Sequence, residues 1–265
     1  MISIPFVKAH GARNDFLLTW RAEFPAEGLD LAAAARAICE RHTGVGADGW
    51  ILLSPAVEVS AAIALYNSDG SLSEISGNGT RCAAALLIQE GRASEDVAIA
   101  TGAGVKHVKL LSFDAKYRLE MNMGRANIEE LHSSIVPGRE SVILNVGNPQ
   151  CAVFVPDFDF DWRGLGAGLE RHSRFPNRTN VSFVRVVDRH TLDVRFFERG
   201  AGETMSSGTG STGAAAAAIA LGVVESPVRV LTPAGPLEIR SQGADMLLIG
   251  PAEIVARGIF LWNPQ

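Results

Sequence analysis

The sequence contains few cysteines, and the three present, Cys39, Cys82 and Cys151, form neither a CxxC pair nor a cluster with histidine. An odd number of widely separated cysteines argues against a disulfide framework and does not give the ligand spacing of a zinc site. We therefore expect no bound metal ion and no disulfide. Such a cysteine content suits a reducing compartment, and we expect the protein to be cytoplasmic.

Long apolar runs and an excess of positive charge are absent as well. The longest apolar run, Ala214–Val224, consists mainly of alanine and is well short of the ~20 residues that a membrane-spanning helix needs. Residues Met1–Lys8 lack the charged start and apolar core of a signal peptide. With 24 Lys and Arg against 29 Asp and Glu, the net charge is -5. We therefore expect binding neither to nucleic acid nor to a membrane.

The composition is that of a globular protein, with 47% hydrophobic and 20% charged residues in a chain of 265. This length fits two modest domains or one large domain. Periodicity and end signals predict helices at Asp30–His42, Gly79–Glu90, Trp162–His172 and Ser211–Leu221. Short alternating or apolar runs predict strands at Ile2–His10, Phe16–Trp20, Trp50–Ser54, Ala61–Asn67, Val97–Ala100, Lys106–Leu111, Arg118–Met123, Val142–Val146, Val153–Val155, Val181–Val187, Thr191–Glu198, Val228–Thr232, Leu237–Arg240 and Met246–Gly250. A further strand at Gly258–Leu261 could return to the first half of the chain. The fold class is α+β.

Two segments of the chain have similar sequences. Residues 76–85 align with residues 207–216, an offset of 131 positions (207 minus 76), which is close to half of 265. At the same offset, Asn67 aligns with Glu198, and each ends a predicted strand. The simplest explanation is two homologous halves, each with a strand, a Gly-rich loop and a helix start in the same order. A chance likeness between two Gly- and Ala-rich helix starts is the alternative.

Each Gly-rich loop leaves backbone N–H groups unpaired at the start of a helix, where the helix dipole adds positive potential. We expect a small anionic group, such as the carboxylate of an amino acid, to bind there. Ser76 and Ser207, each directly before the first glycine, would flank that group. A plain role as helix N-caps explains both serines equally well.

Residues Gly208–Gly213 also match the pattern GxGxxG, which makes a nucleotide-binding protein a remote alternative. A dinucleotide-binding loop follows its strand directly, whereas nine residues separate Glu198 from Gly208 here. The sequence contains no GxxxxGK[ST] run and no lysine in the context of a Schiff base. We therefore expect no nucleotide, pyridoxal phosphate or other cofactor.

Polar residues in turn-like contexts add candidate ligands. Four asparagines are of this kind, namely Asn14, Asn67, Asn148 and Asn180. Asparagine favours turns because of its own local hydrogen bonds, so each of the four, taken by itself, is more readily explained as a structural residue. Glu198 and Arg199 at a strand end could pair with the ammonium and carboxylate groups of a zwitterionic ligand, although a surface ion pair is the ordinary interpretation.

Eight short segments form a set when they are taken in order. They are Gly11–Phe16 (GARNDF), Arg41–Gly49 (RHTGVGADG), Tyr66–Ser71 (YNSDGS), Gly77–Cys82 (GNGTRC), Gly147–Pro149 (GNP), Thr179–Val181 (TNV), Glu198–Thr204 (ERGAGET) and Gly208–Gly210 (GTG). In order and spacing, over nearly the whole chain, this set resembles the diaminopimelate epimerase family.

The resemblance implies two pseudo-symmetric domains, each a sheet curled around a central helix, with the active site in the cleft between them and a homodimer as the assembly. Residues 1–117 and the C-terminal strand 255–265 would form one half, and residues 118–254 the other. The implied reaction is the cofactor-independent inversion of an α-carbon of LL-diaminopimelate, a small zwitterionic amino acid. Its product is the meso form, a precursor of lysine and of the cell wall.

The resemblance also implies residue roles. In the family, two cysteines remove and return the α-proton, and the corresponding positions here are Ser76 and Ser207. The α-carboxylate would bind at Gly77–Asn78 and at Gly208–Thr209. The remaining substrate contacts would be Asn14, Asn67, Asn148, Asn180, Glu198 and Arg199.

The chain departs from the family pattern where the chemistry takes place. Both family cysteines are serines, and Gln150 stands where the family has a histidine after Asn-Pro. A thiol has a pKa near ~8.5 and a helix start lowers it, whereas a serine hydroxyl needs an adjacent base. Gln150 removes the most obvious base, and Glu198 remains as a helper.

Three hypotheses follow from these changes. In the first, which we favour, the protein is a working epimerase in which the serines relay protons with help from Glu198 or water. In the second, the protein is a catalytically impaired variant that binds its substrate without turning it over. In the third, it is a racemase or isomerase of another small amino acid, since the wider fold family includes enzymes similar to proline racemase.

Overall fold

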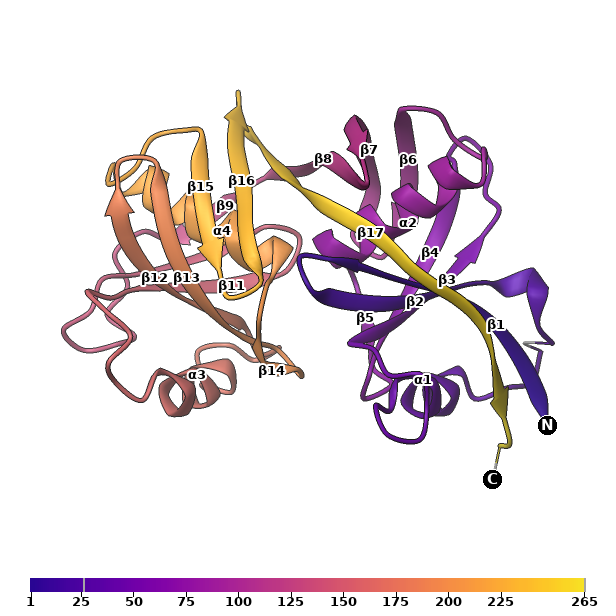
Figure 1. Cartoon of the computed structure of the whole chain (residues 1–265). Helices are drawn as coiled ribbons and strands as arrows, with labels where there is room; N and C mark the ends of the chain where they lie inside the picture. Colours follow the sequence, from indigo (N-terminus) through magenta and orange to yellow (C-terminus); the bar gives the residue numbers. More distant parts are fainter. Residues whose placement is uncertain (26, 265) are drawn as a thin grey trace. The chain divides into compact units, whose positions relative to one another are not determined.

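A computed structural model of the chain describes residues 1–25 and 27–264. Strands dominate these residues, and four α-helices and one short 3-10 helix (Arg21–Glu23) accompany them, so the α+β class is confirmed. The chain divides into two compact units (Figure 1). Unit 1 consists of Met1–Met121 and Pro251–Gln265, and unit 2 consists of Asn122–Gly250.

Unit 1 contains a mixed sheet. Its elements are β1 (Ile2–Gly11), β2 (Asn14–Trp20), α1 (Leu31–Cys39), β3 (Gly49–Ser54), β4 (Ala61–Asn67), β5 (Leu72–Ser73), α2 (Gly77–Gln89), β6 (Asp96–Thr101), β7 (Gly104–Asp114), the first part of β8 (Lys116–Arg125) and the last part of β17 (Asp245–Trp262). The strands pair in the order β17, β1, β2, β3, β4, β6, β7, β8. The β2–β3 and β4–β6 pairs are parallel and the others are antiparallel.

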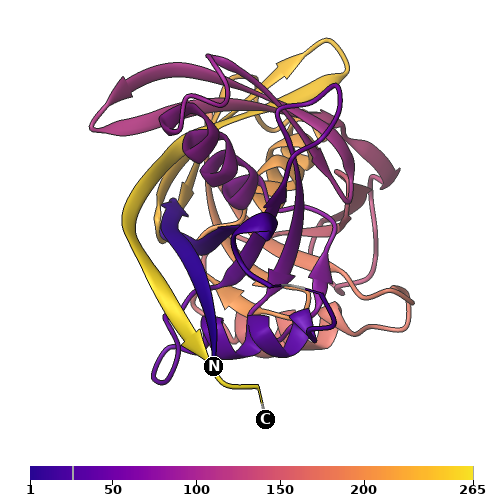
Figure 2. The same cartoon turned by 90° about the vertical axis from the view of Figure 1, so that its right-hand side faces the viewer.

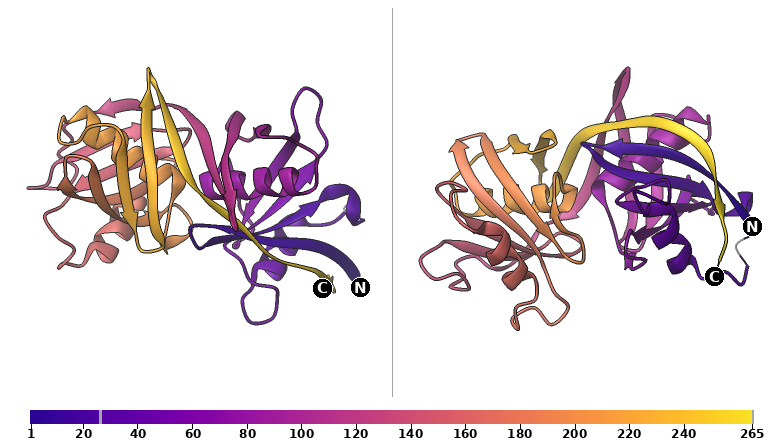
Figure 3. Two further views of the ribbon diagram at one scale, coloured as in Figure 1. Left: turned by 45° about the horizontal axis from the view of Figure 1, so that its top comes forward. Right: turned by 60° about the horizontal axis from the view of Figure 1, so that its bottom comes forward.

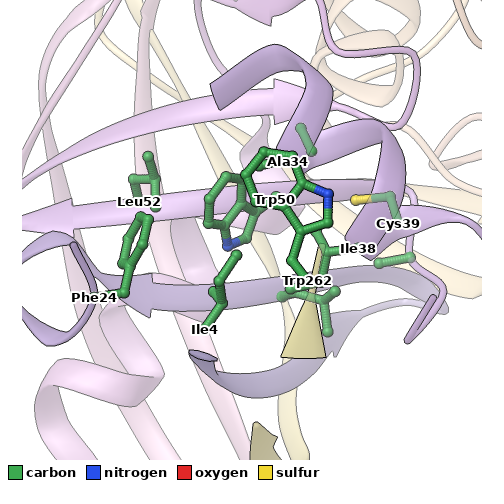
Figure 4. Packing of buried hydrophobic residues seen from close by; sticks show 11 residues of the cluster. Ile4, Phe24, Ala34, Ile38, Cys39, Trp50, Leu52 and Trp262 are labelled. Carbon is green, nitrogen blue, oxygen red and sulfur yellow. The ribbon is translucent and has the colours of Figure 1, made fainter. Parts of the chain in front are cut away.

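The helices α1 and α2 lie on opposite faces of this sheet (Figure 2). Successive side chains of a strand point to opposite faces. On β3, Trp50 and Leu52 therefore pack with α1 (Figure 4), whereas Ile51 faces α2, where a Cβ at Gly79 would lie 3.0 Å from its Cδ1. The small Gly79 thus allows the start of α2 to approach the sheet closely. The buried cluster on the α1 face comprises Ile4, Leu17, Phe24, Ala34, Ala35, Ile38, Cys39, Ala47, Trp50, Leu52 and Trp262.

Unit 2 contains a second mixed sheet. Its elements are the end of β8, β9 (Asn127–Glu130), β10 (Ser141–Asn145), β11 (Pro149–Phe154), α3 (Trp162–Glu170), β12 (Asn180–Asp188), β13 (Thr191–Glu198), β14 (Gly202–Thr204), α4 (Gly208–Ala220), β15 (Val228–Thr232), β16 (Gly235–Gln242) and the start of β17. The strands pair in the order β9, β10, β11, β12, β13, β15, β16, β17, and β14 also pairs with β13. The β11–β12 and β13–β15 pairs are parallel.

The faces of this sheet are again divided between two helices. Phe183 on β12 packs with Trp162 of α3 in one buried cluster, with 5.9 Å between their ring centroids. Phe196 on β13 faces α4, because a Cβ at Gly210 would lie 2.8 Å from its ring. The residues of α4 from Gly208 to Ala218 are all buried, which explains why alanine dominates this helix: only small side chains allow such close approach on every side.

Four predicted helices are confirmed, with shifted ends. The helices α2 and α4 begin at Gly77 and Gly208, directly after Ser76 and Ser207, and not at Gly79 and Ser211. The helix that starts at Trp162 ends at Glu170 and does not reach His172. No helix in residues 1–25 and 27–264 combines the length and apolarity that crossing a membrane requires.

The strand predicted at Met246–Gly250 proved too short. It is the start of β17, an 18-residue strand that also takes in the separately predicted Gly258–Leu261. The first part of β17 pairs with β16 and the later part runs along β1 (Figure 3). Pairing with a different neighbour at each end keeps the chain extended through Gly250 and Pro251, where the local pattern predicted a break.

Candidate functional site

Ser76 caps α2 in unit 1. Its Oγ accepts a hydrogen bond from the Gly79 amide at 3.1 Å, and its carbonyl oxygen accepts from the Thr80 amide at 2.8 Å. Helix geometry then leaves the amides of Gly77 and Asn78 without an intrahelical acceptor. These two N–H groups and the positive end of the helix dipole can together hold a carboxylate.

Asn78 and Asn14 form a hydrogen-bonded pair beside this helix start. Asn78 is fully buried, and its Nδ2 donates to Asn14 Oδ1 at 3.1 Å. Asn14 Nδ2 donates in turn to Asp48 Oδ2 at 2.7 Å, and Arg41 pairs with Asp48 at 2.8 Å. Burial, together with the negative charge of Asp15, raises the pKa of Asp48 above its ordinary value. The structure thus joins two of the predicted site residues through their side chains.

Asn67 has a local role in the structure. Its backbone amide donates to the carbonyl oxygen of Ser71 at 2.8 Å, and its Nδ2 donates to Ser71 Oγ at 3.0 Å. These bonds close the turn that follows β4. Asn67 thus has the local hydrogen bonds that are typical of asparagine in a turn, and its contact with substrate stays a prediction.

Ser207 caps α4 in unit 2 and has an acidic partner. Its Oγ accepts from the Gly210 amide at 3.0 Å and donates to Glu198 Oε2 at 2.8 Å. Thr204 Oγ1 donates to the other oxygen, Glu198 Oε1, at 2.6 Å. Because the Ser207 oxygen accepts a hydrogen bond from the Gly210 amide, its own proton is free to point to the carboxylate of Glu198. A serine whose proton is directed at a carboxylate has the base that a weakly acidic hydroxyl needs.

Gln150 and Asn148 lie against the start of α4. Gln150 Nε2 donates to Asn148 Oδ1 at 2.7 Å, and Asn148 Nδ2 donates to Thr209 Oγ1 at 3.3 Å. A Cβ at Gly213 would be 3.2 Å from Gln150 Cγ, so Gln150 packs directly on the helix. A neutral amide cannot take up a proton at physiological pH. Gln150 therefore orients Asn148 and supplies no base.

Asn180 and Arg199 meet at the end of β13. The Arg199 amide donates to Asn180 Oδ1 at 3.1 Å, and Asn180 Nδ2 donates to the carbonyl oxygen of Pro149 at 2.9 Å. A third residue, Glu170, accepts from the Gly200 amide at 3.3 Å. The structure thus connects the predicted residues Asn180 and Arg199 through the backbone of the turn.

Glu170 is a residue that the sequence did not single out. Its carboxylate is only 1% exposed and pairs with Arg171 at 3.2 Å and with Arg178. A glutamate in the last turn of an amphipathic helix gives no sequence signal for burial, because the segments that cover it come later in the chain. By bonding to Gly200 it anchors the turn that carries Arg199.

We expect Glu170→Gln to lower the free energy of unfolding by about 2–3 kcal/mol, since it leaves two arginines without their buried carboxylate. The two arginines are 76% and 41% exposed, which keeps the loss at the low end of the range for buried pairs. Urea denaturation measures it. Glu203→Gln is the matched control, because Glu203 pairs with Arg163 at the surface and its loss costs less than about 1 kcal/mol. Equal losses in both variants would show that Glu170 does not brace the turn.

The native thiols do not replace the missing cysteines. Cys39, Cys82 and Cys151 are all buried, and burial raises the pKa of each to about 12. They remain protonated at neutral pH and are inert as bases. Among residues 1–25 and 27–264, no group of three or more His, Cys, Asp or Glu side chains is arranged to hold a metal ion.

The GxGxxG pattern does not have the surroundings of a dinucleotide site. The strand β14 lies between β13 and α4, and it pairs antiparallel with β13. A dinucleotide-binding loop instead connects a strand directly to the helix that follows. The glycines serve packing here: Gly210 approaches Phe196, and Gly213 approaches Gln150.

Known proteins resemble the chain over most of its length. A family model described as Diaminopimelate epimerase matches residues 6–129 and 142–255. A protein named diaminopimelate epimerase from Pelotomaculum thermopropionicum is 36% identical over 272 residues, which cover 96% of this chain and 97% of that protein. Another of the same name, from Moorella thermoacetica, is 35% identical over 275 residues, covering 96% of this chain and 98% of that protein.

Solved structures share the fold at low sequence identity. A hydroxyproline epimerase from Agrobacterium vitis, with bound trans-4-hydroxy-L-proline, superposes with a TM-score of 0.74 and 15% identity, covering 97% of this chain and 90% of that one. A predicted epimerase from Pseudomonas aeruginosa superposes with a TM-score of 0.75 and 14% identity, covering 98% of this chain and 100% of that one. At such identities the comparison is one of fold alone.

Proposed function

The chain belongs to the diaminopimelate epimerase family, and we propose that it converts LL-diaminopimelate to the meso form by inverting one α-carbon without a cofactor. The observation that carries the proposal is the hydrogen bond from Ser207 Oγ to Glu198 at 2.8 Å. It gives the serine a proton acceptor at a helix start that is suited to a carboxylate. An amino-acid substrate would present its α-proton and its α-carboxylate together.

The proposal assigns roles by chemistry. The amides of Gly77, Asn78, Gly208 and Thr209 hold the α-carboxylate, and Ser76 and Ser207 relay protons with Glu198. The other substrate contacts are Asn14, Asn67, Asn148, Asn180, Glu198 and Arg199.

The same proposal includes two related halves with a sheet curled around α2 and around α4. In its support, both helices have 13 residues and a serine cap. Each also has a glycine at its third position, Gly79 or Gly210, against a phenylalanine of the neighbouring sheet.

The test follows the α-proton directly. Wild-type protein is incubated with LL-diaminopimelate in D2O, and NMR follows the loss of the α-proton and the appearance of the meso form. We expect both to occur. If the protein neither exchanges the proton nor binds the compound at millimolar concentration, the substrate assignment is wrong.

A second candidate is a protein that binds diaminopimelate without inverting it. The neutral Gln150, in the position of the family's histidine, favours this candidate because it removes one proton acceptor. Binding without any proton exchange in the same NMR experiment would select it. Exchange with another small amino acid alone would instead select a different racemase.

A homodimer completes the proposal. Three apolar side chains of β17 are exposed, namely Val255 (58%), Ile259 (63%) and Leu261 (56%), and a second copy of the chain would cover them. We expect sedimentation to give twice the chain mass of 28.1 kDa. Ile259→Lys should shift the mass toward the monomer, because it places a charge in the apolar contact. A wild-type monomer at micromolar concentration would contradict the dimer.

A further inference from the structure

Arg81, in the second turn of α2, is a buried cation whose partners are neutral oxygens. It is fully buried, and no carboxylate pairs with it in the part of the chain that the structure describes. Nη2 donates to Asn78 Oδ1 at 2.5 Å, and Nη1 and Nε donate to the carbonyl oxygens of Gly77 and Pro251 at 3.1 and 3.4 Å. Burial lowers the pKa of Arg81 to about 10, so it stays charged at neutral pH. Because arginine has no acceptor, the atom of Asn78 that faces it is the oxygen.

Asp48 lies at the other end of the same hydrogen-bonded group and accepts at both oxygens. Its Oδ1 accepts from Arg41 at 2.8 Å. Its Oδ2 accepts from the Asp15 amide at 3.1 Å and from Asn14 Nδ2 at 2.7 Å. A carboxylate carries only acceptors, so the atom of Asn14 that faces Asp48 is the nitrogen.

Two asparagine side chains connect these ends. Asn78 turns its oxygen to Arg81, which leaves its nitrogen to face Asn14, and Asn78 Nδ2 donates to Asn14 Oδ1 at 3.1 Å. Asn14 turns its nitrogen to Asp48, which leaves its oxygen to face Asn78. The donor end and the acceptor end therefore demand the same orientation of both amides. Neither amide can turn over in this relay, Arg81–Asn78–Asn14–Asp48, without placing two donors or two acceptors face to face.

The corresponding helix of unit 2 shows which contact of Arg81 needs an arginine. At the offset of 131 positions, Arg81 corresponds to Thr212. Thr212 Oγ1 donates to the carbonyl oxygen of Gly208 at 2.9 Å, as Arg81 donates to that of Gly77. A hydroxyl thus suffices for this contact with the first helical residue. The bond to Asn78 is the contact for which Arg81 is required.

We propose that Arg81 and Asp48 are positioning residues that hold the amides of Asn78 and Asn14 in a single orientation for the substrate, an inference that rests on the proposed function. Both act through the asparagines and need no contact with the substrate. The relay uses one N–H of Asn14 and leaves the second for a ligand. Because the amides are fixed before the ligand arrives, binding does not have to order them.

A double-mutant cycle between the two ends tests the relay, since Arg81 and Asp48 share no hydrogen bond or ion pair among the described residues. Calorimetry measures the Kd of LL-diaminopimelate for Arg81→Met, Asp48→Asn and the double variant, each shown to be folded by circular dichroism. We expect each single change to raise Kd at least about 10-fold. The double variant should stay within about 3-fold of the weaker single variant, because a relay without one end gives the other nothing to fix. A Kd raised by the product of the two single effects would overturn the inference.

Asp15→Asn, combined with Arg81→Met, is the matched control for charge. The carboxylate of Asp15 pairs with Lys8 and Arg41 beside Asp48, and in the described part of the chain it bonds to neither asparagine side chain. A purely electrostatic coupling with Arg81 would appear in this pair as well. We expect the effects on Kd to multiply to within about 2-fold. Equal coupling in both pairs would contradict the relay.

Two further variants separate positioning from stability. Arg81→Lys keeps a cation without acceptors and should restore Kd to within a few-fold of wild type, whereas Thr212→Val should leave Kd unchanged. If Arg81→Met lowers Tm but the folded variant keeps the wild-type Kd, or if Arg81→Lys binds as weakly as Arg81→Met, Arg81 is not a positioning residue. A wild-type protein that does not bind LL-diaminopimelate overturns the proposed function as well, whereas binding with independent effects of the two ends overturns this inference alone.

Discussion

Glu198→Gln is expected to lower kcat for the inversion of LL-diaminopimelate by about 10³-fold, within the range that a general base contributes. The glutamine side chain has nearly the same shape as glutamate. It can keep contacts with Thr204 and Ser207, whose hydroxyl groups donate hydrogen bonds to Glu198 at 2.6 and 2.8 Å. It cannot take up the serine proton, because a neutral amide has no basic site at physiological pH. Steady-state kinetics, with circular dichroism as the check on folding, measures this.

Two further variants separate the base from its surroundings. Thr204→Val removes one hydrogen bond to Glu198 and keeps the carboxylate, and we expect kcat to fall by about 10-fold or less, equivalent to about 1.4 kcal/mol or less. Glu203→Gln makes the same chemical change five positions later, on β14, at an exposed carboxylate paired with Arg163, and should leave kcat unchanged. An active Glu198→Gln protein, within a few-fold of wild type, would show that Glu198 is not the base.

The parts of the site that could be predicted from the sequence depend on local geometry. A serine directly before a Gly-rich helix start is a strong N-cap signal, and both Ser76 and Ser207 have that role in the structure. The family resemblance made Glu198 a helper of the serines, and Ser207 does donate to Glu198 Oε2 at 2.8 Å. In each case the determining contacts lie within ten residues along the chain.

The parts that could not be predicted depend on contacts that are distant along the chain. Arg81 has the pattern of an ordinary helical arginine, but it is fully buried and donates to the carbonyl oxygen of Pro251, 170 positions later. Glu170 is buried by the turn that contains Gly200, 30 positions later. The full length of β17 depends on pairing with β1 at the opposite end of the chain. Periodicity and propensity describe a segment and its neighbours, and they carry no information on such pairings.

The hydrogen bonds also explain why the asparagines could not be ranked. Asn14 and Asn67 both lie in turns with similar sequence surroundings. In the structure the side chain of Asn14 bonds to Asp48 and Asn78, whereas the side chain of Asn67 bonds to Ser71 of its own turn. The difference arises from the α2 helix start, which lies beside the turn of Asn14 and fixes its amide.

The double variant Ser76→Cys with Ser207→Cys is expected to exchange the α-proton at least about 100-fold faster than the wild-type protein. A thiol ionises near pKa ~8.5 and a helix start lowers this value, so a thiolate base forms at neutral pH without help from a second residue. A serine hydroxyl gains no comparable charge from the helix. The measurement is the loss of the α-proton signal in D2O, and a double variant no faster than wild type would show that the hydroxyls do not limit the rate.

The single variants extend this prediction to the charge near each position. The thiol at position 76 would lie at the start of the helix that carries the buried cation Arg81, so the pKa of this thiol should fall below ~8.5. The thiol at position 207 would face Glu198, and the negative charge of Glu198 should raise the pKa of that thiol. The ultraviolet absorbance of the thiolate as a function of pH measures both values without any need for turnover or for access of a reagent. The native Cys39, Cys82 and Cys151 do not interfere, because they are buried and burial raises the pKa of each to about 12. Equal pKa values at the two positions would contradict this prediction, because Arg81 and Glu198 would then exert no opposite fields on them.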